Sequence, residues 1–412
     1  MKSLAAAALV LVLAASAAAQ TPTPARWTLD DVATRVRERH LAIEVARHRI
    51  DAARAEQITA RLRPNPTLTL SAENVPLAGP TPASELYEAG VTLSQPLEWA
   101  DTRAARRAVA GEGVALAEAQ LAEVVHRQVI AAKRAFVDAA VGDRMTVEAR
   151  ADQAAVGEFA AITRARFEAG AVPEADVLKA ALETAKADAA VADAEAAARR
   201  ARVALAALLG IDAGADVSLG PLPAVPMAPD LPTLRALAET HRPSLRAAER
   251  TVSVAEQRVA LERSRSTAPV SPFAGVKRVG ENTTVLFGIS IPLPLTDRNQ
   301  GAIARAEAET RASRAELELH RRQVVSDVEA AWIAWDRART RLVAFETRML
   351  RPADELATIA RDAYRQDAVP LLGYLEAQRT RTEARREHAR ALADAHAAYV
   401  ALEQAIGREL AQ

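Results

Sequence analysis

The sequence contains no cysteine among its 412 residues. This absence excludes disulfide bridges, thiolate metal ligands, a cysteine nucleophile and a lipid anchor on an N-terminal cysteine. Aromatic residues are also scarce, at 3%, and no run of eighteen apolar residues follows the first twenty positions. No transmembrane helix is therefore predicted, and a membrane location would require a β-barrel.

Motifs of enzymatic chemistry are absent as well. The sequence has no GxSxG, HExxH or phosphate-binding loop, so no catalytic centre, nucleotide site or cofactor is predicted. No two of the seven histidines lie three or four residues apart, the spacing that brings two ligands together on one helix, and no metal site is predicted. Since 53 basic and 53 acidic residues cancel, nothing indicates a nucleic-acid partner.

The first nineteen residues have the pattern of a secretory signal peptide. Lys2 supplies the positive charge, residues 4–13 form an apolar segment, and residues 17–19 are a small-residue cleavage site. A retained N-terminal anchor helix is the alternative. We predict cleavage after residue 19, because no acidic residue interrupts the segment, and hence export of the remaining chain.

The sequence is rich in alanine and in charged residues, which recur at helical spacing. Apolar residues make up 50% and charged residues 26%, a composition typical of long helices. Helices are predicted over residues 27–63, 99–167, 174–209, 233–266, 297–364 and 371–406. At 1.5 Å per residue, the helices over 99–167 and 297–364 are each about 100 Å long, which is too long for a globular domain.

Four short segments alternate apolar and polar residues and predict β-strands in two hairpins. They cover residues 67–75, 86–95, 272–279 and 283–291. The third strand is the weakest of the four. Lys277 and Arg278 are neighbours in it, so one of these two charged side chains must face awkwardly.

Each hairpin is followed by a joint at which strand changes to long helix. Pro96 and Asp101 mark the first joint, and Pro292, Pro294 and Asp297 mark the second. Proline ends a strand because it lacks the ladder donor. Thr296 and Asp297 are predicted as candidate caps of the helix that follows.

The chain is thus a duplicated unit of helix, hairpin, very long helix, break and return helix. We predict the first unit over residues 20–210, a Pro- and Gly-bearing connector over 211–232, and the second unit over 233–412. Pro96 and Asp101 lie 196 positions before Pro292 and Asp297. The predicted fold class is mostly α with a small β part.

A single chain, with two such units, cannot close a barrel by itself. Four strands are too few for a barrel, which needs about eight, and the long amphipathic helices need partners for their apolar stripes. An oligomer that shares one barrel and continues it as a tube of helices meets both requirements. The alternative is an ordinary small sheet on a helical stalk.

The breaks after the long helices resemble those of a known family. The segment RFEAGAVPEADVL, residues 166–178, and its counterpart YRQDAVPLLGYL, residues 364–375, are similar to the two helix-turn-helix tips of the TolC family of outer-membrane efflux channels. The stretch SIPLPLTDRNQG, residues 290–301, is similar to the CzcC-type branch, which works with cation-exporting RND pumps.

This resemblance implies an assembly and its partners. It implies a homotrimer with a 12-stranded β-barrel in the outer membrane of a Gram-negative bacterium, continued by a long α-helical barrel through the periplasm. The implied partners are a periplasmic membrane-fusion adaptor, an inner-membrane RND-type pump and outer-membrane lipid.

The resemblance also assigns residues to the tip turns, where the adaptor would bind. These residues are Ala169, Gly170 and Ala171 in the first tip, and Gln366, Asp367 and Ala368 in the second. The first tip keeps the glycine of the family at Gly170. Asp367 stands at that place in the second tip, which leaves the geometry of the second turn open.

A gate that closes the resting pore is implied just after the second tip. It would include Gly373 and Glu376, with Asp176 after the first tip bonding across to Tyr364. Three copies of Glu376 at a constriction would attract cations and repel one another. A solvated position on the helix surface is the alternative for Glu376.

Together with these patterns, the resemblance implies a passive duct, the outer-membrane component of a tripartite efflux system, for divalent heavy-metal cations such as zinc, cobalt and cadmium. Drugs or organic toxins are the alternative cargo. A periplasmic adaptor and a purely structural coiled-coil protein are alternatives of other classes. The first would need additional β domains, and the second would leave the amphipathic hairpins without a role.

Overall fold

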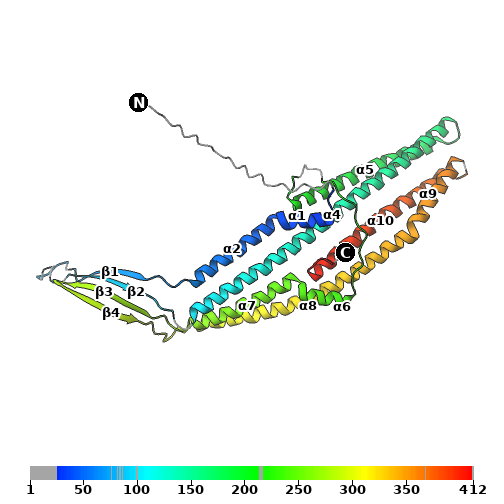
Figure 1. The fold of residues 1–412 in the computed structure, drawn as a ribbon. Helices are drawn as coiled ribbons and strands as arrows, with labels where there is room; N and C mark the ends of the chain where they lie inside the picture. The colour runs from blue at the N-terminus through cyan, green and yellow to red at the C-terminus, as the bar shows by residue number, and fades with distance from the viewer. Residues whose placement is uncertain are drawn as a thin grey trace, which may run out of the picture.

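In a computed structural model, the described chain runs from residue 26 to residue 410, without residues 76, 81, 83, 84, 86, 99, 100, 213–216 and 367. The predicted signal peptide, residues 1–19, lies outside the described residues. The described part is elongated, with a four-stranded sheet at one end and two helical hairpin tips at the other (Figure 1).

Helices make up most of the described chain, and the strands fall in two short groups. The elements in chain order are α1 (Leu29–Arg39), α2 (Leu41–Arg61), β1 (Thr67–Glu73), β2 (Glu88–Ser94), α4 (Thr102–Glu168), α5 (Glu174–Leu209), α6 (Leu231–His241), α7 (Pro243–Ser264), β3 (Ser271–Val279), β4 (Asn282–Ser290), α8 (Gln300–Ala344), η1 (Phe345–Met349), α9 (Leu350–Arg365) and α10 (Leu371–Ile406). The prediction of a mostly α chain with a small β part is confirmed.

The four strands form one antiparallel sheet in the order β1-β2-β3-β4. The hairpin β1–β2 comes from the first half of the chain and β3–β4 from the second, so the pairing of β2 with β3 joins the two halves. In this register Val91 lies opposite Leu70 on one side and Val276 on the other. Among the described residues, β1 and β4 have no partner along their outer edges.

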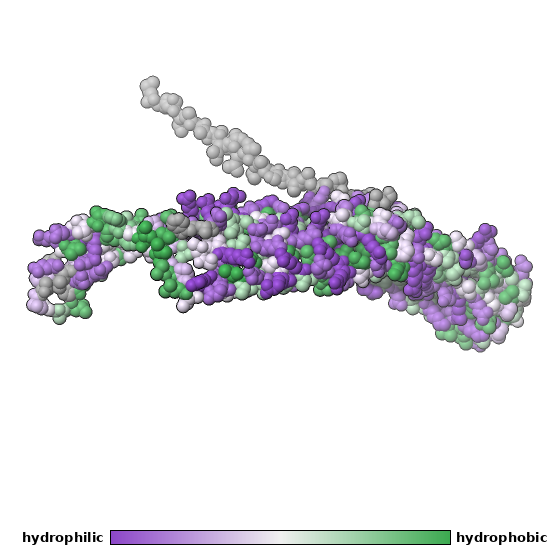
Figure 2. Space-filling model, turned by 90° about the horizontal axis from the view of Figure 1, so that it is seen from below, coloured by the Kyte–Doolittle hydropathy of each residue, from purple (hydrophilic) through white to green (hydrophobic). Residues whose placement is uncertain are grey.

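One face of the sheet is apolar. Because side chains alternate along a strand, the register places Leu68, Leu70, Val91, Val276 and Phe287 on the same face. The exposed fractions of these side chains run from 47% for Val91 to 85% for Phe287. On the side seen in Figure 2, green patches of hydrophobic residues gather over the sheet and its junction with the helices.

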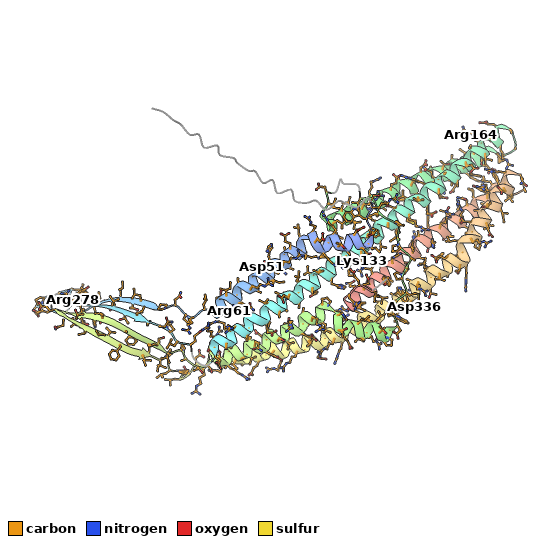
Figure 3. The ribbon with its side chains drawn as sticks, in the orientation of Figure 1. Asp51, Arg61, Lys133, Arg164, Arg278 and Asp336 are labelled. Atoms are coloured by element: carbon orange, nitrogen blue, oxygen red, sulfur yellow. The ribbon has the colours of Figure 1, made fainter. Side chains whose placement is uncertain are left out.

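The two neighbouring charges of β3 lie on opposite faces. Lys277 lies on the polar face and forms ion pairs with Glu73 and Glu88. Arg278 shares the apolar face, but it lies one residue from the end of β3, where its Nε donates a hydrogen bond to the carbonyl oxygen of Gly280 at 3.1 Å. Arg278 is therefore the residue with the awkward position, at the far end of the sheet (Figure 3).

The helices form a single layer whose order changes along its length. Next to the sheet the order is α2, α4, α7 and α8, and toward the tips it is α5, α4, α10 and α9 (Figure 1). α4 runs through both regions, and its 67 residues make a helix about 100 Å long. None of the described helices combines the length and the apolarity needed to cross a membrane.

Two corresponding apolar cores lie in the middle of the molecule. In the first half, α1 packs Val32 and Val36 against α4 and α5. In the second half, α6 packs Leu234 against α8 and α10. Corresponding glycines also end the return helices, since Gly210 after α5 has a φ of 63° and Gly407 after α10 a φ of 80°, which glycine adopts without strain.

Two of the predicted helices are each two helices. The helix predicted for residues 27–63 is broken at His40, whose backbone is extended and whose Nδ1 accepts a hydrogen bond from the amide of Ala42 at 3.1 Å, capping α2. The helix predicted for residues 233–266 is broken at Arg242, because Pro243 disfavours helical backbone at the residue before it.

The second long helix begins later than predicted. Its N-cap is Asn299, with a φ of 61°, so the prediction of Thr296 or Asp297 as its cap is wrong. Asp297 Oδ1 instead accepts a hydrogen bond from the amide of Asn299 at 2.9 Å and closes a local turn. Asp101, with a φ of 57°, precedes α4 in the same way, which makes Asn299 its structural counterpart.

A π-helical turn also interrupts the second long helix. The segment η1 separates α8 from α9, whereas α4 in the first half continues without interruption. A π turn inserts one residue into the helical ladder and shifts the helix faces on its two sides relative to each other. The periodic pattern in the sequence did not reveal it.

Candidate functional site

The two helical hairpins end beside each other at the end of the molecule opposite the sheet (Figure 1). In the first turn the amide of Ala171 donates to the carbonyl of Arg166 at 2.8 Å, and in the second the amide of Ala368 donates to the carbonyl of Ala363 at 2.9 Å. Both turns are thus closed by the same bond over five residues. Gly170 supplies the left-handed backbone of the first turn, with a φ of 76°.

The residues predicted for adaptor contact lie on these turns. Those within the described part of the chain are all exposed: Ala169, Gly170, Ala171, Gln366 and Ala368. Asp367 lies outside the described residues. Small, exposed side chains leave the backbone of the turns accessible to a partner.

Three aromatic rings join the two hairpins behind the turns. They belong to Phe159 of α4, Tyr364 of α9 and Tyr374 of α10, with ring centroids 4.9 to 5.6 Å apart. The Tyr364 hydroxyl lies 3.2 Å from Thr163 Oγ1, and the Arg166 guanidinium lies 4.9 Å from the centre of the Tyr364 ring. Burial raises the pKa of Tyr374. We call these five residues the tip cluster.

Of the predicted gate residues, only Tyr364 belongs to the tip cluster. Asp176 pairs with Lys179 on its own helix at 3.4 Å. Because the described partner of the Tyr364 hydroxyl is Thr163, the structure has these two contacts in place of the predicted bond between Asp176 and Tyr364.

The other two predicted gate residues lie on the first turns of α10. Gly373 is crowded, since a Cβ atom there would lie 2.8 Å from Cγ1 of Val369. Glu376 is exposed, whereas its neighbours Tyr374 and Leu375 are buried. A side chain larger than hydrogen at position 373 would require the Val369 side chain to move.

Polar contacts between the hairpins continue from the tip cluster along α10. Asp152 of α4 accepts hydrogen bonds from Thr382 Oγ1 at 2.6 Å and from Gln378 Nε2 at 3.2 Å. Glu183 of α5 accepts one from Arg379 Nη2 at 2.6 Å. We call these five residues the hairpin seam. A groove of about 430 Å³ follows it.

Electrostatics strengthens the seam at Glu183. Burial alone would raise the pKa of this carboxyl, but hydrogen bonds from Lys186 and Arg379 and their charges outweigh it and hold the pKa below its ordinary value. Glu183 is therefore a carboxylate at neutral pH, which makes its bond to Arg379 charge-assisted.

A buried ion pair joins α4 to α10 in the middle of the molecule, where Lys133 is labelled in Figure 3. Lys133 Nζ lies 2.8 Å from Glu403 Oε2, and the two side chains are 8% and 3% exposed. Glu403 Oε1 also accepts a hydrogen bond from the amide of Leu410 at 3.1 Å. Burial raises the pKa of Glu403, and the charge of Lys133 opposes this shift.

The predicted joint residues lie between the sheet and the helices. Pro96 follows the end of β2, yet pairing with the second half continues for one more step, because Leu97 forms a bridge with Val270. Pro292 and Pro294 are exposed in the segment between β4 and α8. Backbone pairing therefore continues past the proline at the first joint, whereas at the second joint β4 ends at Ser290, before both prolines.

Within the part of the chain that the structure describes, no three His, Cys, Asp or Glu side chains gather so as to hold a metal ion. The nearest approach of a buried histidine to a carboxylate is a pair, with His388 Nε2 3.6 Å from Glu346 Oε1. Two ligands alone do not make a structural or catalytic metal centre.

Sequence reasoning missed most of the contacts between the hairpins. Thr163, Phe159 and Asp152 lie about 200 positions before their partners on α9 and α10. The only local signal was the spacing of Phe159 and Thr163, which lie four residues apart and so share one helix face.

The sequence is similar to a known family and to individual proteins over most of its length. The sequence model of a family described as outer membrane efflux protein matches residues 32–211 and 234–408. Cobalt-zinc-cadmium resistance protein CzcC of Cupriavidus metallidurans is 28% identical over 377 residues, which cover 89% of this chain and 86% of that protein. Nodulation protein T of Rhizobium leguminosarum bv. trifolii is 26% identical over 397 residues, covering 89% and 83%.

Solved structures share the architecture. The outer-membrane channel OprN superimposes with a TM-score of 0.78 at 21% identity, covering 92% of this chain and 90% of OprN. The outer membrane protein VceC of Vibrio cholerae gives a TM-score of 0.77 at 17% identity, covering 92% and 96%. At these identities the likeness concerns the fold.

Proposed function

The chain belongs to the outer membrane efflux protein family, and from this premise we propose that three copies of it form a passive export duct for divalent heavy-metal cations. Each copy contributes four strands to a shared twelve-stranded barrel in the outer membrane and its helices to a tube through the periplasm. Energy comes from an inner-membrane RND-type pump, reached through a membrane-fusion adaptor. No enzymatic step is assigned to this chain.

The observation that carries the proposal is a sheet with two open edges and one exposed apolar face. Open edges are a liability that closure into a barrel removes. Pairing β1 of one copy with β4 of the next closes them and turns side chains such as Leu70 and Phe287, 73% and 85% exposed in one chain, toward lipid. The polar face then lines the passage.

The two side edges of the helical layer support the same assembly. On one edge, Leu41 of α2 and Leu182 of α5 are 73% and 63% exposed. On the other edge, Ile333 of α8 and Ile359 of α9 are 62% and 67% exposed. Packing the first edge of one copy on the second edge of its neighbour removes this apolar surface from water.

The adaptor and the gate belong to the tips in this proposal. The adaptor binds the tip turns at Ala169, Gly170, Ala171, Gln366, Asp367 and Ala368. The passage narrows at Gly373 and Glu376, beside Asp176 and Tyr364. Separation of the two hairpins along the hairpin seam widens it.

The assignment of metal cations as cargo rests on two observations. CzcC, a relative named for resistance to cobalt, zinc and cadmium, matches most of this chain. Three copies of the exposed Glu376 around a narrow passage would favour cations over anions.

Growth of a deletion strain tests the cargo. We expect lower tolerance of zinc, cobalt and cadmium than in the parent, with unchanged tolerance of a panel of antibiotics, and recovery when the intact gene is restored. In the parent and the restored strain, fractionation is expected to recover the protein in the outer membrane. Unchanged metal tolerance would contradict the cargo, and recovery of the protein in the soluble periplasm would contradict the channel.

Organic molecules are the second candidate cargo. Nodulation protein T, whose name refers to nodulation and not to metals, matches this chain at 26%, close to the 28% of CzcC. Greater sensitivity of the deletion strain to antibiotics, with unchanged metal tolerance, would favour this candidate.

A further inference from the structure

Three charged side chains stand together on the polar face of the sheet. That face otherwise carries Thr, Ser, Gly, Asn and a few apolar residues, and Glu73, Glu88 and Lys277 are its only charged residues within the four strands. All three lie toward the strand ends that point away from the helices, near Arg278 in Figure 3. We call them the charge triad.

The triad is built across three strands. Lys277 Nζ lies 3.2 Å from Glu73 Oε2 on β1 and also contacts Glu88 Oε2 on β2. To reach β1, the lysine side chain passes over β2 at Gly90, its partner in the register. A Cβ at Gly90 would lie 2.7 Å from Ser71 Oγ on β1 and 3.9 Å from Lys277 Cγ, so the strands and the lysine pack closely over this glycine.

The triad carries one uncompensated negative charge per chain. The ammonium group of Lys277 contacts one oxygen of each carboxylate. The side chains of Lys277, Glu88 and Glu73 are 28%, 19% and 56% exposed. The two carboxylates therefore stay accessible from the polar face while the ammonium group holds them together. Without the lysine, two adjacent carboxylates would repel each other and offer paired oxygen ligands, which hard divalent cations favour.

We propose that the charge triad is an ion filter of the passage enclosed by the barrel, in which Glu73 and Glu88 favour cations and Lys277 limits how tightly they hold them. This inference rests on the proposed function, because it requires the polar face to line the passage. Copies of the triad from three chains form one ring near the outer mouth, where fixed charges select permeating ions. The lysine prevents the ring from trapping the divalent cations that it admits.

Reversal potentials of single channels in planar bilayers, measured across a KCl gradient, test the filter. We expect K277Q to raise the permeability of K⁺ relative to Cl⁻ by about threefold, since each chain loses one positive charge close to the ion path. The same variant should be blocked by Zn²⁺ at a lower concentration than the wild type. The double variant E73Q/E88Q should shift the selectivity in the opposite direction.

Two further variants separate selectivity from folding. Lys277→Arg keeps the charge and is expected to keep the selectivity of the wild type. R278Q removes the same charge one residue away, on the opposite face, and is expected to leave selectivity unchanged. If K277Q and R278Q form channels of normal conductance with the same ion selectivity as each other, the proposal of an ion filter is wrong. The proposal of an export duct would still stand. A wild-type protein that forms no channels would overturn both.

Discussion

The return helices α5 and α10 have the same length and the same place in the two halves, yet they are covered very differently. Each has 36 residues. Six side chains of α5 are buried, whereas seventeen of α10 are, among them Gln378, His388, His396 and Glu403. Helices of equal length at corresponding positions thus lie in unequal environments.

Position in the layer explains the difference. α10 lies between α4 and the α8–α9 helix and also contacts α6. α5 lies at the edge, where it packs mainly on α4 and α1 and meets α10 near the tips, as in the bond from Arg379 to Glu183. Buried polar groups on α10 need partners within the chain. Exposed leucines on α5 need a partner outside it, and the proposed trimer supplies one. Contacts of α10 therefore stabilise a single chain, whereas the exposed face of α5 is expected to join neighbouring copies.

The largest expected effect comes from breaking the buried pair that ties α10 to α4. Lys133→Met leaves the Glu403 carboxylate buried without its cation, and we expect a loss of about 3–5 kcal/mol in the free energy of unfolding, measured by chemical unfolding in detergent. Lys179→Met on α5 removes an exposed pair and should cost about 0–1 kcal/mol. Equal effects of the two substitutions would contradict the account of α10.

The loss in Lys133→Met should depend on pH. Burial already raises the pKa of Glu403, and removing Lys133 removes the charge that opposes this rise. A carboxyl group whose pKa is higher in the folded than in the unfolded state does not lower the free energy of unfolding at a pH below its unfolded pKa. As the pH rises toward and through the folded pKa, the unfolded state loses its proton first, so the folded state becomes less stable. The variant should therefore lose more stability at pH 8 than at pH 5, and a pH-independent loss would argue against this cause.

A smaller effect is expected at the uncovered edge of α5. Leu182, 63% exposed in one chain, becomes buried in the proposed assembly. Leu182→Ser should weaken each contact between copies by about 1.5–3 kcal/mol and lower the temperature at which the oligomer dissociates in detergent. Leu77→Ser, at a loop residue that is fully exposed (101%), is the control and should have no effect. An unchanged dissociation temperature for Leu182→Ser would show that α5 is not an interface.

The hairpin seam offers a test of how α10 moves relative to the first hairpin. Asp152→Asn weakens the contacts to Gln378 and Thr382, and we expect the open probability of single channels to rise by about tenfold, the equivalent of one lost hydrogen bond. Asp188→Asn makes the same change at a bond from Gln153 within the first hairpin and should leave gating unchanged. If the two variants have the same open probability, the hairpin seam does not control opening of the channel.

The smallest effect is expected at Glu376, which is exposed on α10. Glu376→Gln should reduce the preference for cations by about twofold, because one negative charge per chain is lost at the proposed constriction. Single-channel reversal potentials measure this change. Unaltered selectivity and conductance would make Glu376 an ordinary surface residue.

Local patterns sufficed for much of the fold. Alternation of apolar residues located all four strands to within two residues of their observed bounds. Gly210 and Gly407 marked the ends of the return helices, because glycine adopts the left-handed backbone of a C-terminal cap. These features depend on neighbours within a few positions, so the sequence reveals them directly.

Features that depend on distant contacts were not predictable in this way. The position of Asn299 at the start of α8 is held by its side-chain bond to the carbonyl of Glu262, 37 positions away. In the tip cluster, Thr163 and Tyr364 lie 201 positions apart. No periodicity within one helix specifies such a partner.

Recording single channels from the purified wild-type protein in planar bilayers tests the central claim most directly. The account predicts discrete, uniform conductance steps, because the sheets of three copies close into one passage lined by their polar faces. A protein that is purified folded from the outer membrane and never raises the conductance of the bilayer would contradict it.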